Sequence, residues 1–447
     1  MTGSDTIAAI ATPPGTGGVG IVRVSGADAF SICRKICGDC PPARTATLRK
    51  FRDIDGNVVD HGLILSFASP SSFTGEDLVE FQGHGGAMVL DMLLEAVLAA
   101  GARIARPGEF SERAFLNDRI DLVQAEAIAD LIESGTRSGA RLALRSLEGE
   151  FSSRVDEIAA DMNGVRMYVE AAIDFPEEEI DFLADSDAGH RISTLIERLE
   201  SLIGRCDRGS ILRDGLNVVL CGAPNAGKSS LLNRLSGKAR AIVTDTPGTT
   251  RDLLDENIQI GGVRLNLTDT AGLRDDAGPI EQEGIRRARG AMRQADLVVM
   301  VRDASETATG DDKGLRHDLP EDVPILTVWN KIDLTGQEAG VNLDDDLELY
   351  VSAKHGSGID ALESRLSEFA LGDYREENLI LARRRHLDAL TRALEHVRNA
   401  NQRLISGAGE LVAEELRLGH EFLGQITGRV SSDDLLGQIF SSFCIGK

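Results

Sequence analysis

The residues Gly222-Ala-Pro-Asn-Ala-Gly-Lys-Ser229 fit the phosphate-binding pattern G-x-x-x-x-G-K-[ST], with every fixed position filled. The glycines allow backbone amides to approach an anion closely, Lys228 is placed to bridge the outer phosphates of a nucleotide, and the Ser229 hydroxyl is a ligand for Mg²⁺. An apolar run before the loop predicts a strand, and the run from Ser230 to Leu235 predicts a helix. The predicted phosphate contacts are Asn225, Ala226, Gly227, Lys228, Ser229 and Ser230.

A second loop predicts which base is bound. Asn330-Lys-Ile-Asp333 follows the apolar run Ile325–Trp329, which places it at the end of a parallel strand, where ligands bind in doubly wound folds. The Asp333 carboxylate can accept hydrogen bonds from both N1 and N2 of guanine, whereas adenine offers no such pair of donors, so GTP is favoured over ATP. Val351-Ser-Ala-Lys354 completes the pocket, and the predicted base contacts are Asn330, Lys331, Asp333, Ser352, Ala353 and Lys354.

Two further segments supply groups around Mg²⁺ and the third phosphate. Asp269-Thr-Ala-Gly272 brings a carboxylate to the Mg²⁺ side and a glycine amide to the γ-phosphate. Thr249 and Thr250 lie in a loop rich in turn-forming residues that can close over Mg²⁺ only when a third phosphate is present. We predict Ser229 and Thr250 as Mg²⁺ ligands, and nucleotide contacts from Thr244, Asp245, Thr246, Pro247, Gly248, Thr249, Thr250, Asp269, Thr270, Ala271 and Gly272. The order and spacing of these motifs predict a GTPase.

Leu273 departs from the Ras-like arrangement, in which a glutamine at this point orients the attacking water. Leucine cannot hold water, so another polar group must do so. The acidic segment that follows leaves four candidates open, and most of them are expected to be solvated surface residues: Asp275, Asp276, Glu281 and Glu283.

The order of these motifs, together with Gly248-Thr-Thr-Arg-Asp252, Asp269–Arg274 and the C-terminal Phe443-Cys-Ile-Gly-Lys447, resembles the MnmE (TrmE) family of GTPases that modify the wobble uridine of tRNA. The resemblance covers essentially the whole chain. It extends to four N-terminal motifs, namely Ala11–Gly15, Phe73–Glu76, Gly83–Gly86 and Arg106–Asn117.

The family is activated by potassium, and the resemblance implies a K⁺ ion beside the phosphates, where it stabilises charge that develops on the β–γ bridge. The family's catalytic carboxylate falls by spacing on Glu281, and it is expected to act with Lys228 and Asn225. A surface glutamate that caps a helix is the alternative for Glu281. The implied K⁺ ligands offer oxygen atoms, which suit a hard cation: Asn225, Thr244, Thr246 and Thr249.

The resemblance also implies a tetrahydrofolate-binding N-terminal domain, in which a reduced folate (5-formyl or 5,10-methylene) supplies the one-carbon unit for uridine C5. The implied folate contacts are Arg23, Glu80, Arg119 and Lys447. The alternative for Arg23 and Glu80 is a structural pair between two strands. The implied assembly is a homodimer that forms a heterotetramer with an FAD protein of the MnmG (GidA) type. It acts on tRNA and adds an aminomethyl or carboxymethylaminomethyl group.

The elements that must position these residues indicate two or three domains in 447 residues. Residues 1–117 mix strand-like runs with a helix over 87–100, whereas apolar residues recur at helical spacing from residue 118 onward and again over 379–440. We predict an α/β plus all-α protein with three domains. They are an α+β folate-binding-like domain (1–117), a helical domain (118–212 and 373–447), and a Ras-like doubly wound GTPase (G) domain (213–372) inserted into the helical domain.

The charge balance restricts how the chain can bind nucleic acid. Asp and Glu number 72 against 48 Lys and Arg, a net charge of −24, whereas a protein that holds RNA mainly through phosphate contacts should be basic. We therefore expect a modest, salt-sensitive affinity for tRNA that depends on a partner protein. The compact basic run Arg383-Arg-Arg-His386 is either a solvated helix face or an RNA contact.

Six cysteines, without a signal peptide or a transmembrane run, indicate a reducing cytoplasmic setting and no membrane partner. Cys33-x₃-Cys37-x₂-Cys40 imitates the cluster-binding triplet of radical SAM enzymes, but the pattern places it on an amphipathic helix, Ala27–Ile36, and packed thiols are favoured. A ribosome-assembly GTPase switch of the Era/Der type is the second alternative. It would need a KH-like RNA-binding domain after the GTPase domain, where this chain is predicted to be helical.

Overall fold

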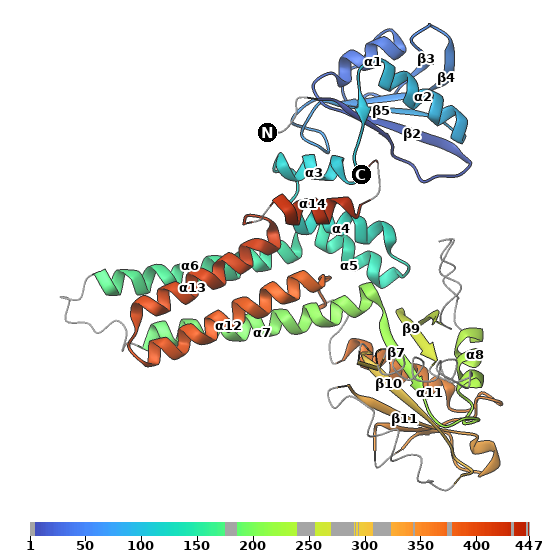
Figure 1. Ribbon diagram of the computed structural model, residues 1–447, viewed down its shortest axis with the longest axis vertical. Helices are drawn as coiled ribbons and strands as arrows, with labels where there is room; N and C mark the ends of the chain where they lie inside the picture. The colour runs from blue at the N-terminus through green and yellow to red at the C-terminus, as the bar shows by residue number, and fades with distance from the viewer. Residues whose placement is uncertain are drawn as a thin grey trace, which may run out of the picture. The chain divides into compact units, whose positions relative to one another are not determined.

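The computed structural model divides into two compact units (Figure 1). It describes residues 5–174, 186–238, 255–269, 290, 292–293, 295–306, 323–342, 345–372, 378–430, 433–443 and 446. The first unit is formed by Met1–Ala129, Leu147–Glu177 and Ala408–Lys447, and the second by Asp130–Ser146 and Glu178–Gly407. Each unit therefore contains segments that are far apart in the sequence.

The first unit begins with a six-stranded sheet in the order β3-β4-β5-β2-β1-β6, in which neighbours run antiparallel except β1 and β6. Its strands are β1 (Ile7–Ile10), β2 (Gly17–Ser25), β3 (Thr47–Arg52), β4 (Val58–Phe67), β5 (Leu78–Gly85) and β6 (Arg103–Ile104). Helices α1 (Ala29–Cys37) and α2 (Ala87–Ala99) pack on the sheet and enclose a core that includes Phe51, Phe81 and Leu93 (Figure 1).

The alternation of side chains along β2 positions a candidate site residue. Val22 and Val24 are fully buried in the core beneath the two helices, so Arg23 between them points to the opposite face of the sheet. The strand register places Arg23 directly across from Glu80 of β5. A smaller apolar cluster that includes Phe110 covers part of this second face.

Helices make up the rest of the first unit: α3 (Glu109–Leu116), most of α4 (Leu122–Glu133), α6 (Glu150–Asp174), α13 (Gly409–Thr427) and α14 (Asp433–Ser441). Helices α6 and α13 pack along each other (Figure 1). Phe440 of α14 and Phe443 just after it pack with Phe115 and Leu122. The C-terminal segment is thus held by apolar contacts beside α3 and α4.

The helical part of the second unit contains the end of α4, most of α5 (Arg137–Leu147), α7 (Ser186–Asp214) and α12 (Arg384–Ile405). Helices α7 and α12 lie side by side (Figure 1). Gly209 of α7 lies against the segment that precedes α12, because a Cβ there would be 1.9 Å from the carbonyl oxygen of Ile380. Glycine is needed for this close approach, which anchors the start of α12 on α7.

A seven-stranded sheet in the order β12-β13-β11-β10-β7-β9-β8 completes the second unit. Its strands are β7 (Leu216–Cys221), β8 (Asp255–Ile260), β9 (Val263–Asp269), β10 (Leu297–Asp303), β11 (Ile325–Asn330), β12 (Gly340–Val341) and β13 (Glu348–Tyr350), with α8 (Lys228–Lys238) and α11 (Ile359–Leu371) among its helices. The five inner strands run parallel, and β12 and β8 are antiparallel at the edges. Because parallel strands end at the same edge, the carboxyl ends of β7, β9, β11 and β13 lie there, and the loops after β7, β11 and β13 begin at that edge.

The elements confirm a mixed α/β protein with an N-terminal domain and a helical part. The strands predicted before the phosphate loop and over 325–329 are present as β7 and β11, and the helix predicted over 27–36 spans 29–37 because Gly38, with a φ of 86°, ends it. In the tail, residues 379–382 are buried but not helical, which corrects the start of the predicted helical region. The predicted domain boundaries stay predictions. No helix within the described residues is long and apolar enough to cross a membrane.

Candidate nucleotide site and a second polar site

The predicted phosphate loop joins the end of β7 to the start of α8 (Figure 1). Gly222 and Gly227 have positive φ values of 147° and 96°. A Cβ on Gly222 would lie 2.2 Å from the carbonyl oxygen of Val301, and a Cβ on Gly227 would lie 2.2 Å from Nδ2 of Asn330. Both the backbone conformation and the close neighbours therefore require glycine at these positions.

Lys228 and Asn225 lie in the same loop. The Lys228 ammonium donates to the carbonyl oxygens of Gly222 and Ala223 at 3.0 and 2.9 Å, and the residue is 6% exposed. A buried ammonium beside the amides of a helix N-terminus is suited to compensate phosphate charge. Asn225 is exposed and has a φ of 65°, a left-handed conformation that asparagine adopts more readily than most residues.

Asn330 links the phosphate loop to the base loop. The residue is 2% exposed, its Nδ2 donates to the carbonyl of Ala226 at 3.0 Å, and its Oδ1 accepts from the amide of Ala353 at 3.0 Å. Ala226 follows β7, Asn330 ends β11 and Ala353 follows β13. One side chain thus fixes three predicted contact segments relative to one another.

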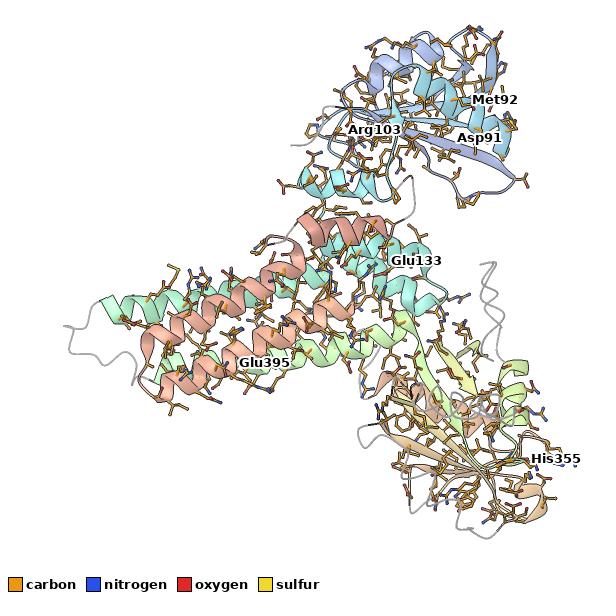
Figure 2. All side chains as sticks on the ribbon, viewed as in Figure 1. Asp91, Met92, Arg103, Glu133, His355 and Glu395 are labelled. Carbon is orange, nitrogen blue, oxygen red and sulfur yellow. The ribbon has the colours of Figure 1, made fainter. Side chains whose placement is uncertain are left out.

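The carboxylate of Asp333 is oriented by Ser352. Ser352 Oγ donates to Asp333 Oδ1 at 2.6 Å, and this hydrogen bond is the main reason that the pKa of the Asp333 carboxyl lies below its usual value. His355 lies in the loop after β13 (Figure 2). Its Nε2 is 3.8 Å from Asp333 Oδ2. Asp333 is therefore an ionised acceptor at neutral pH, as recognition of the guanine donors requires. The neighbouring Lys331 donates to Asp303 at 2.6 Å, and Lys354 is exposed.

Two oxygen ligands suited to Mg²⁺ lie at adjacent strand ends. The Ser229 hydroxyl is exposed in the first turn of α8, as is Ser230, and Asp269 is 3% exposed at the end of β9. Strand β9 pairs with β7, with Asp269 beside Leu220. Hydroxyl and carboxylate oxygens fit a hard divalent cation. The following predicted contacts and candidates lie outside the described residues: Thr244 to Thr250, Thr270 to Leu273, Asp275, Asp276, Glu281 and Glu283.

The structure brings Arg23 and Glu80 together with the C-terminal tail. Arg23 donates from Nη2 and Nε to Glu80 Oε1 at 2.9 and 3.0 Å, and from Nη1 to the carbonyl of Gly446 at 3.3 Å. The guanidinium carbon lies 5.8 Å from the ring centroids of both Phe73 and Phe110. The cross-strand pair expected as the alternative to a folate role is present, and a folate role for these residues stays a prediction.

Arg119 and Gly446 contact segments on either side of the Arg23 site, namely the loop Phe73–Glu76 and the end of β1. The exposed Arg119 packs against Gly75, where a Cβ would lie 3.2 Å from its Cγ. Gly446 lies against β1, because a Cβ there would be 2.4 Å from the carbonyl oxygen of Ile10. Gly446 therefore lies at the end of β1 beside Arg23. Lys447 and Cys444 lie outside the described residues.

An ionic network that sequence reasoning missed supports the loop Phe73–Glu76. Arg113 donates to Glu76 at 3.0 Å and to Glu109 at 3.1 Å, and Arg103 also pairs with Glu109, whose side chain is 3% exposed. Burial raises the pKa of Glu109, but hydrogen bonds from Arg103, from a backbone amide and from Arg113 outweigh burial and lower the pKa to about 2. The only signal for this network was the resemblance of its two segments to family motifs.

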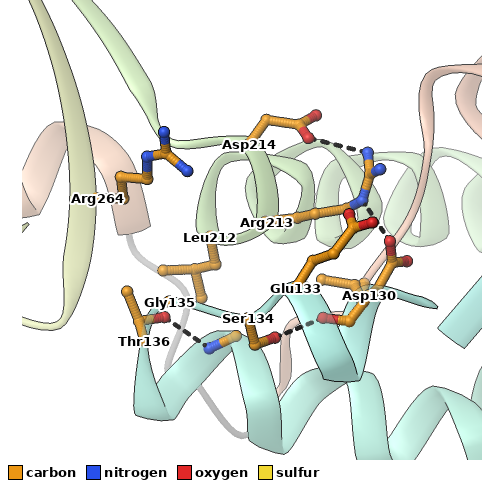
Figure 3. A pocket seen from close by; sticks show the side chains of 11 residues that line it. Asp130, Glu133, Ser134, Gly135, Thr136, Leu212, Arg213, Asp214 and Arg264 are labelled. Carbon is orange, nitrogen blue, oxygen red and sulfur yellow. Dashed lines mark hydrogen bonds and ion pairs between the residues drawn. The ribbon is translucent and has the colours of Figure 1, made fainter. Parts of the chain in front are cut away.

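A cavity of about 200 Å³ in the second unit lies where α4, α5 and α7 meet the start of the sheet (Figure 3). Asp130, on its wall, accepts from Arg213 Nε at 2.9 Å and from Arg383 Nη2 at 2.8 Å. The Asp130 side chain is 6% exposed. The predicted site residues that the structure describes do not line this cavity. Its ion pairs join α4 to the end of α7 and the start of α12.

The basic run at 383–386 was predicted to be either a solvated helix face or an RNA contact, and neither interpretation holds for all four of its residues. Arg383 is the N-cap residue of α12 and pairs with Asp130, while His386 is 2% exposed and its Nδ1 accepts from the Arg383 amide. Both residues are therefore structural, because they close the start of α12. Arg384 alone in this run is exposed.

The cysteine triplet lies around the end of α1. Cys33 is buried on the helix, Cys37 ends it, and Cys40 is half-buried in the following loop. All three are free thiols, and burial contributes to raising the pKa of Cys40 to about 12. Within the described ranges, no group of three or more His, Cys, Asp or Glu residues is arranged to hold a metal ion.

Comparisons with known proteins match the whole length of the chain. The family model of the MnmE helical domain matches residues 122–444, and that of the GTP-binding protein TrmE N-terminus matches residues 6–119. The tRNA modification GTPase MnmE of Methylococcus capsulatus is 51% identical over 444 residues, with 99% of each chain covered. The protein of the same name from Hydrogenovibrio crunogenus is 49% identical over 446 residues, again with 99% of each chain covered.

Solved structures match only part of the chain. The G domain of the T. maritima FeoB iron transporter is 26% identical, covers 35% of this chain and 98% of its own, and superposes with a TM-score of 0.27. Aquifex aeolicus Era bound to GDP.AlF4⁻ is 24% identical, covers 40% of this chain and 66% of its own, and has a TM-score of 0.26. Scores of this size do not indicate a shared function.

Proposed function

Because the chain belongs to the MnmE (TrmE) family of tRNA-modification GTPases, we propose that it hydrolyses GTP as part of tRNA modification. The observation that carries the proposal is that Asn330 ties the phosphate loop to the base loops at one edge of the parallel sheet, where Asp269 also ends its strand. The Era/Der alternative is disfavoured, because relatives named tRNA modification GTPase MnmE match over 99% of this chain.

Each described residue of the nucleotide site has a role in this proposal. The loop amides and Lys228 bind the phosphates, and Lys228 stabilises negative charge that moves toward the bridging oxygen during hydrolysis. Asp333 accepts from N1 and N2 of guanine. Ser229 and Thr250 would hold Mg²⁺, with Asp269 on the same side, and the ion would neutralise charge on the outer phosphates.

Hydrolysis also needs a group that orients water and a charge beside the phosphates. With leucine at position 273, we assign the water-orienting role to Glu281, which the family spacing favours over the neighbouring carboxylates. A K⁺ ion held by Asn225, Thr244, Thr246 and Thr249 would supply the charge. Asn225 supports this assignment, because it is exposed in the phosphate loop and carries a side-chain oxygen.

We extend the proposal to the reaction that GTP hydrolysis serves. The chain forms a homodimer and, with an FAD protein of the MnmG (GidA) type, adds an aminomethyl or carboxymethylaminomethyl group to C5 of the wobble uridine of certain tRNAs in the cytoplasm. Its GTPase domain is a Ras-like doubly wound domain inserted into the helical domain. The parallel inner strands of the second sheet and the matched helical model support this arrangement.

The one-carbon unit is proposed to come from a reduced folate, 5-formyl- or 5,10-methylene-tetrahydrofolate, bound by Arg23, Glu80, Arg119 and Lys447. Arg23 supports this role, because the Glu80 carboxylate and two aromatic rings fix its guanidinium at the face of the sheet beside the tail. Folates carry an anionic glutamate tail, which a cationic rim would attract.

Ion dependence of GTP hydrolysis tests the proposed catalytic site. Replacing K⁺ by Na⁺ at constant ionic strength should lower the rate by about tenfold or more, and Rb⁺, which is close to K⁺ in radius, should largely restore it. Lys228→Ala is the control for background activity and should remain inactive in all three salts. Equal rates of the wild-type protein in K⁺, Na⁺ and Rb⁺ would contradict a K⁺ site.

A further inference from the structure

Arg234 connects the helix of the phosphate loop to the loop of the base pocket. It lies on α8, which begins at Lys228, and its Nε donates to the carbonyl of Ala353 at 2.9 Å. Its Nη2 donates to the carbonyl of Lys354 at 2.5 Å. The two bonds use one rigid, planar side chain to hold two successive carbonyls of the same loop.

The peptide groups of Ala353 are held on both sides. Its amide donates to Asn330, and its carbonyl accepts from Arg234. Ser352, the residue before it, donates to Asp333 at 2.6 Å and also accepts from the amide of His355 at 3.3 Å. The position of the Ser352 hydroxyl, and with it the direction of the Asp333 carboxylate, therefore depends on how firmly this loop is fixed.

We infer that Arg234 is a positioning residue for guanine recognition, which acts by holding the 352–354 loop so that Ser352 aims the Asp333 carboxylate. The inference rests on the proposed binding of GTP. Arg234 touches neither Asp333 nor a reacting group in the described contacts, so its effect is on base selectivity and not on the chemical step.

Loss of the Arg234 hydrogen bonds should weaken recognition of the guanine N2 amine more than recognition of N1. Recognition of N1 and N2 together needs the carboxylate plane aligned with the guanine edge, whereas a single bond to N1 tolerates a rotated carboxylate. Inosine triphosphate lacks the N2 amine. The ratio of ITP to GTP dissociation constants therefore measures how well Asp333 is aligned, independently of how well the phosphates bind.

Arg234→Met removes the donors and keeps the length of the side chain. We expect it to reduce the selectivity for GTP over ITP by about tenfold, which corresponds to about 1.4 kcal/mol. It should raise KM for GTP while kcat at saturating GTP stays near wild type. Arg234→Lys, which keeps the charge and can donate to one carbonyl, should retain an intermediate selectivity.

Arg365→Met is the matched control. Arg365 also donates from Nε and Nη2 to a backbone carbonyl, that of Asp346 at 3.0 and 2.8 Å, but it lies on α11 and does not hold the base loop. This variant should leave the ITP to GTP ratio unchanged. A second check is Asp333→Asn, in whose background Arg234→Met should no longer change the ratio, because the carboxylate it positions is gone.

The outcomes separate the inference from the proposed function. If Arg234→Met weakens GTP and ITP equally, or if Arg365→Met changes the ratio as much, Arg234 has only a structural role and the inference is overturned. If Arg234→Met does not fold, a wild-type ratio in Arg234→Lys and Arg234→Gln would overturn it as well. A wild-type protein that shows no preference for GTP over ITP and ATP would instead contradict the proposed function.

Discussion

Lys228 and Asp333 lie at the two ends of the proposed nucleotide site, and their positions allow the two proposed roles to be tested separately. Lys228 is buried in the phosphate loop, with its ammonium on the loop carbonyls. Asp333 lies on a different loop, and a hydroxyl donor fixes its carboxylate. A change at Lys228 should therefore affect all nucleoside triphosphates, whereas a change at Asp333 should affect only the choice of base.

Asp333→Asn should exchange the base preference. The amide NH₂ of asparagine donates a hydrogen bond where the carboxylate accepts one, so it repels the N2 amine of guanine and pairs with the carbonyl that xanthine carries there. We expect the affinity of the variant for GTP to fall by about a hundredfold or more, and its affinity for xanthosine triphosphate to rise. Competition binding between the two nucleotides measures the exchange. A variant that keeps its preference for GTP would show that Asp333 does not contact the base.

Glu109 should make the first unit sensitive to acid. Its pKa of about 2 in the folded protein lies below the ordinary value of 4.5. A carboxyl with a lowered folded pKa contributes stability that is complete above pH 4.5 and is lost as the pH falls toward 2. Glu109→Gln lacks this contribution, so its unfolding midpoint should fall less between pH 5 and pH 3 than that of the wild type. Calorimetry at several pH values tests this, and parallel curves for the two proteins would contradict it.

The sequence predicted the residues that belong to short motifs, in which particular side chains recur at fixed spacing. Gly222, Lys228 and Asp333 lie where their patterns placed them, on loops after parallel strands. Arg234 could not be predicted, because its partners are backbone carbonyls, which leave no signal in the partner's sequence. Glu109 could not be predicted either, since its burial depends on arginines whose proximity only the fold reveals.

In the second unit, the carboxylate of Asp130 at the end of α4 pairs with arginines from two other helix ends. It belongs to α4, and it receives Arg213 near the end of α7 and Arg383 at the start of α12. These two helix ends flank the segment that contains the parallel sheet. The ion pairs therefore hold the entry and the exit of that segment together.

Removing Asp130 should destabilise the second unit. Asp130→Ala leaves two half-buried guanidinium groups without their shared acceptor, and we expect a loss of about 3 kcal/mol in the free energy of unfolding. Fluorescence of Trp329, the single tryptophan, reports unfolding of this unit during denaturant titration. Asp388→Ala is the control, because the pair between Asp388 and Arg392 is 60% and 54% exposed and should contribute little. Equal midpoints for the two variants would contradict a structural role for the Asp130 cluster.

The elements differ in how far the sequence determined them. Strands β7 and β11 of the second sheet were predictable, because each is a short apolar run that ends at a polar motif. The contacts at the start of α12 were not, since the basic run 383–386 was expected to be a solvated helix face or an RNA contact. Arg383 is instead held by an acidic residue far away in the sequence, and its neighbour His386 is buried.

Each of the two units of the molecule carries one candidate site, the nucleotide site in the second unit and the Arg23 site in the first. The nucleotide site follows from motifs in one continuous stretch of sequence. The Arg23 site combines β2, β5, a loop and the C-terminal tail, and only the fold shows that Gly446 lies against Arg23. We propose that GTP hydrolysis at one site serves uridine chemistry at the other, so loss of either site should abolish the modification.

Nucleoside mass spectrometry of tRNA from a deletion strain tests the proposed function most directly. The strain should lack the aminomethyl-type group at C5 of the wobble uridine, and a plasmid copy of the wild-type chain should restore it. A copy with Lys228→Ala, which disables the phosphate loop, should not. Full modification in the deletion strain, or equal restoration by the Lys228→Ala copy, would contradict a GTPase that drives tRNA modification.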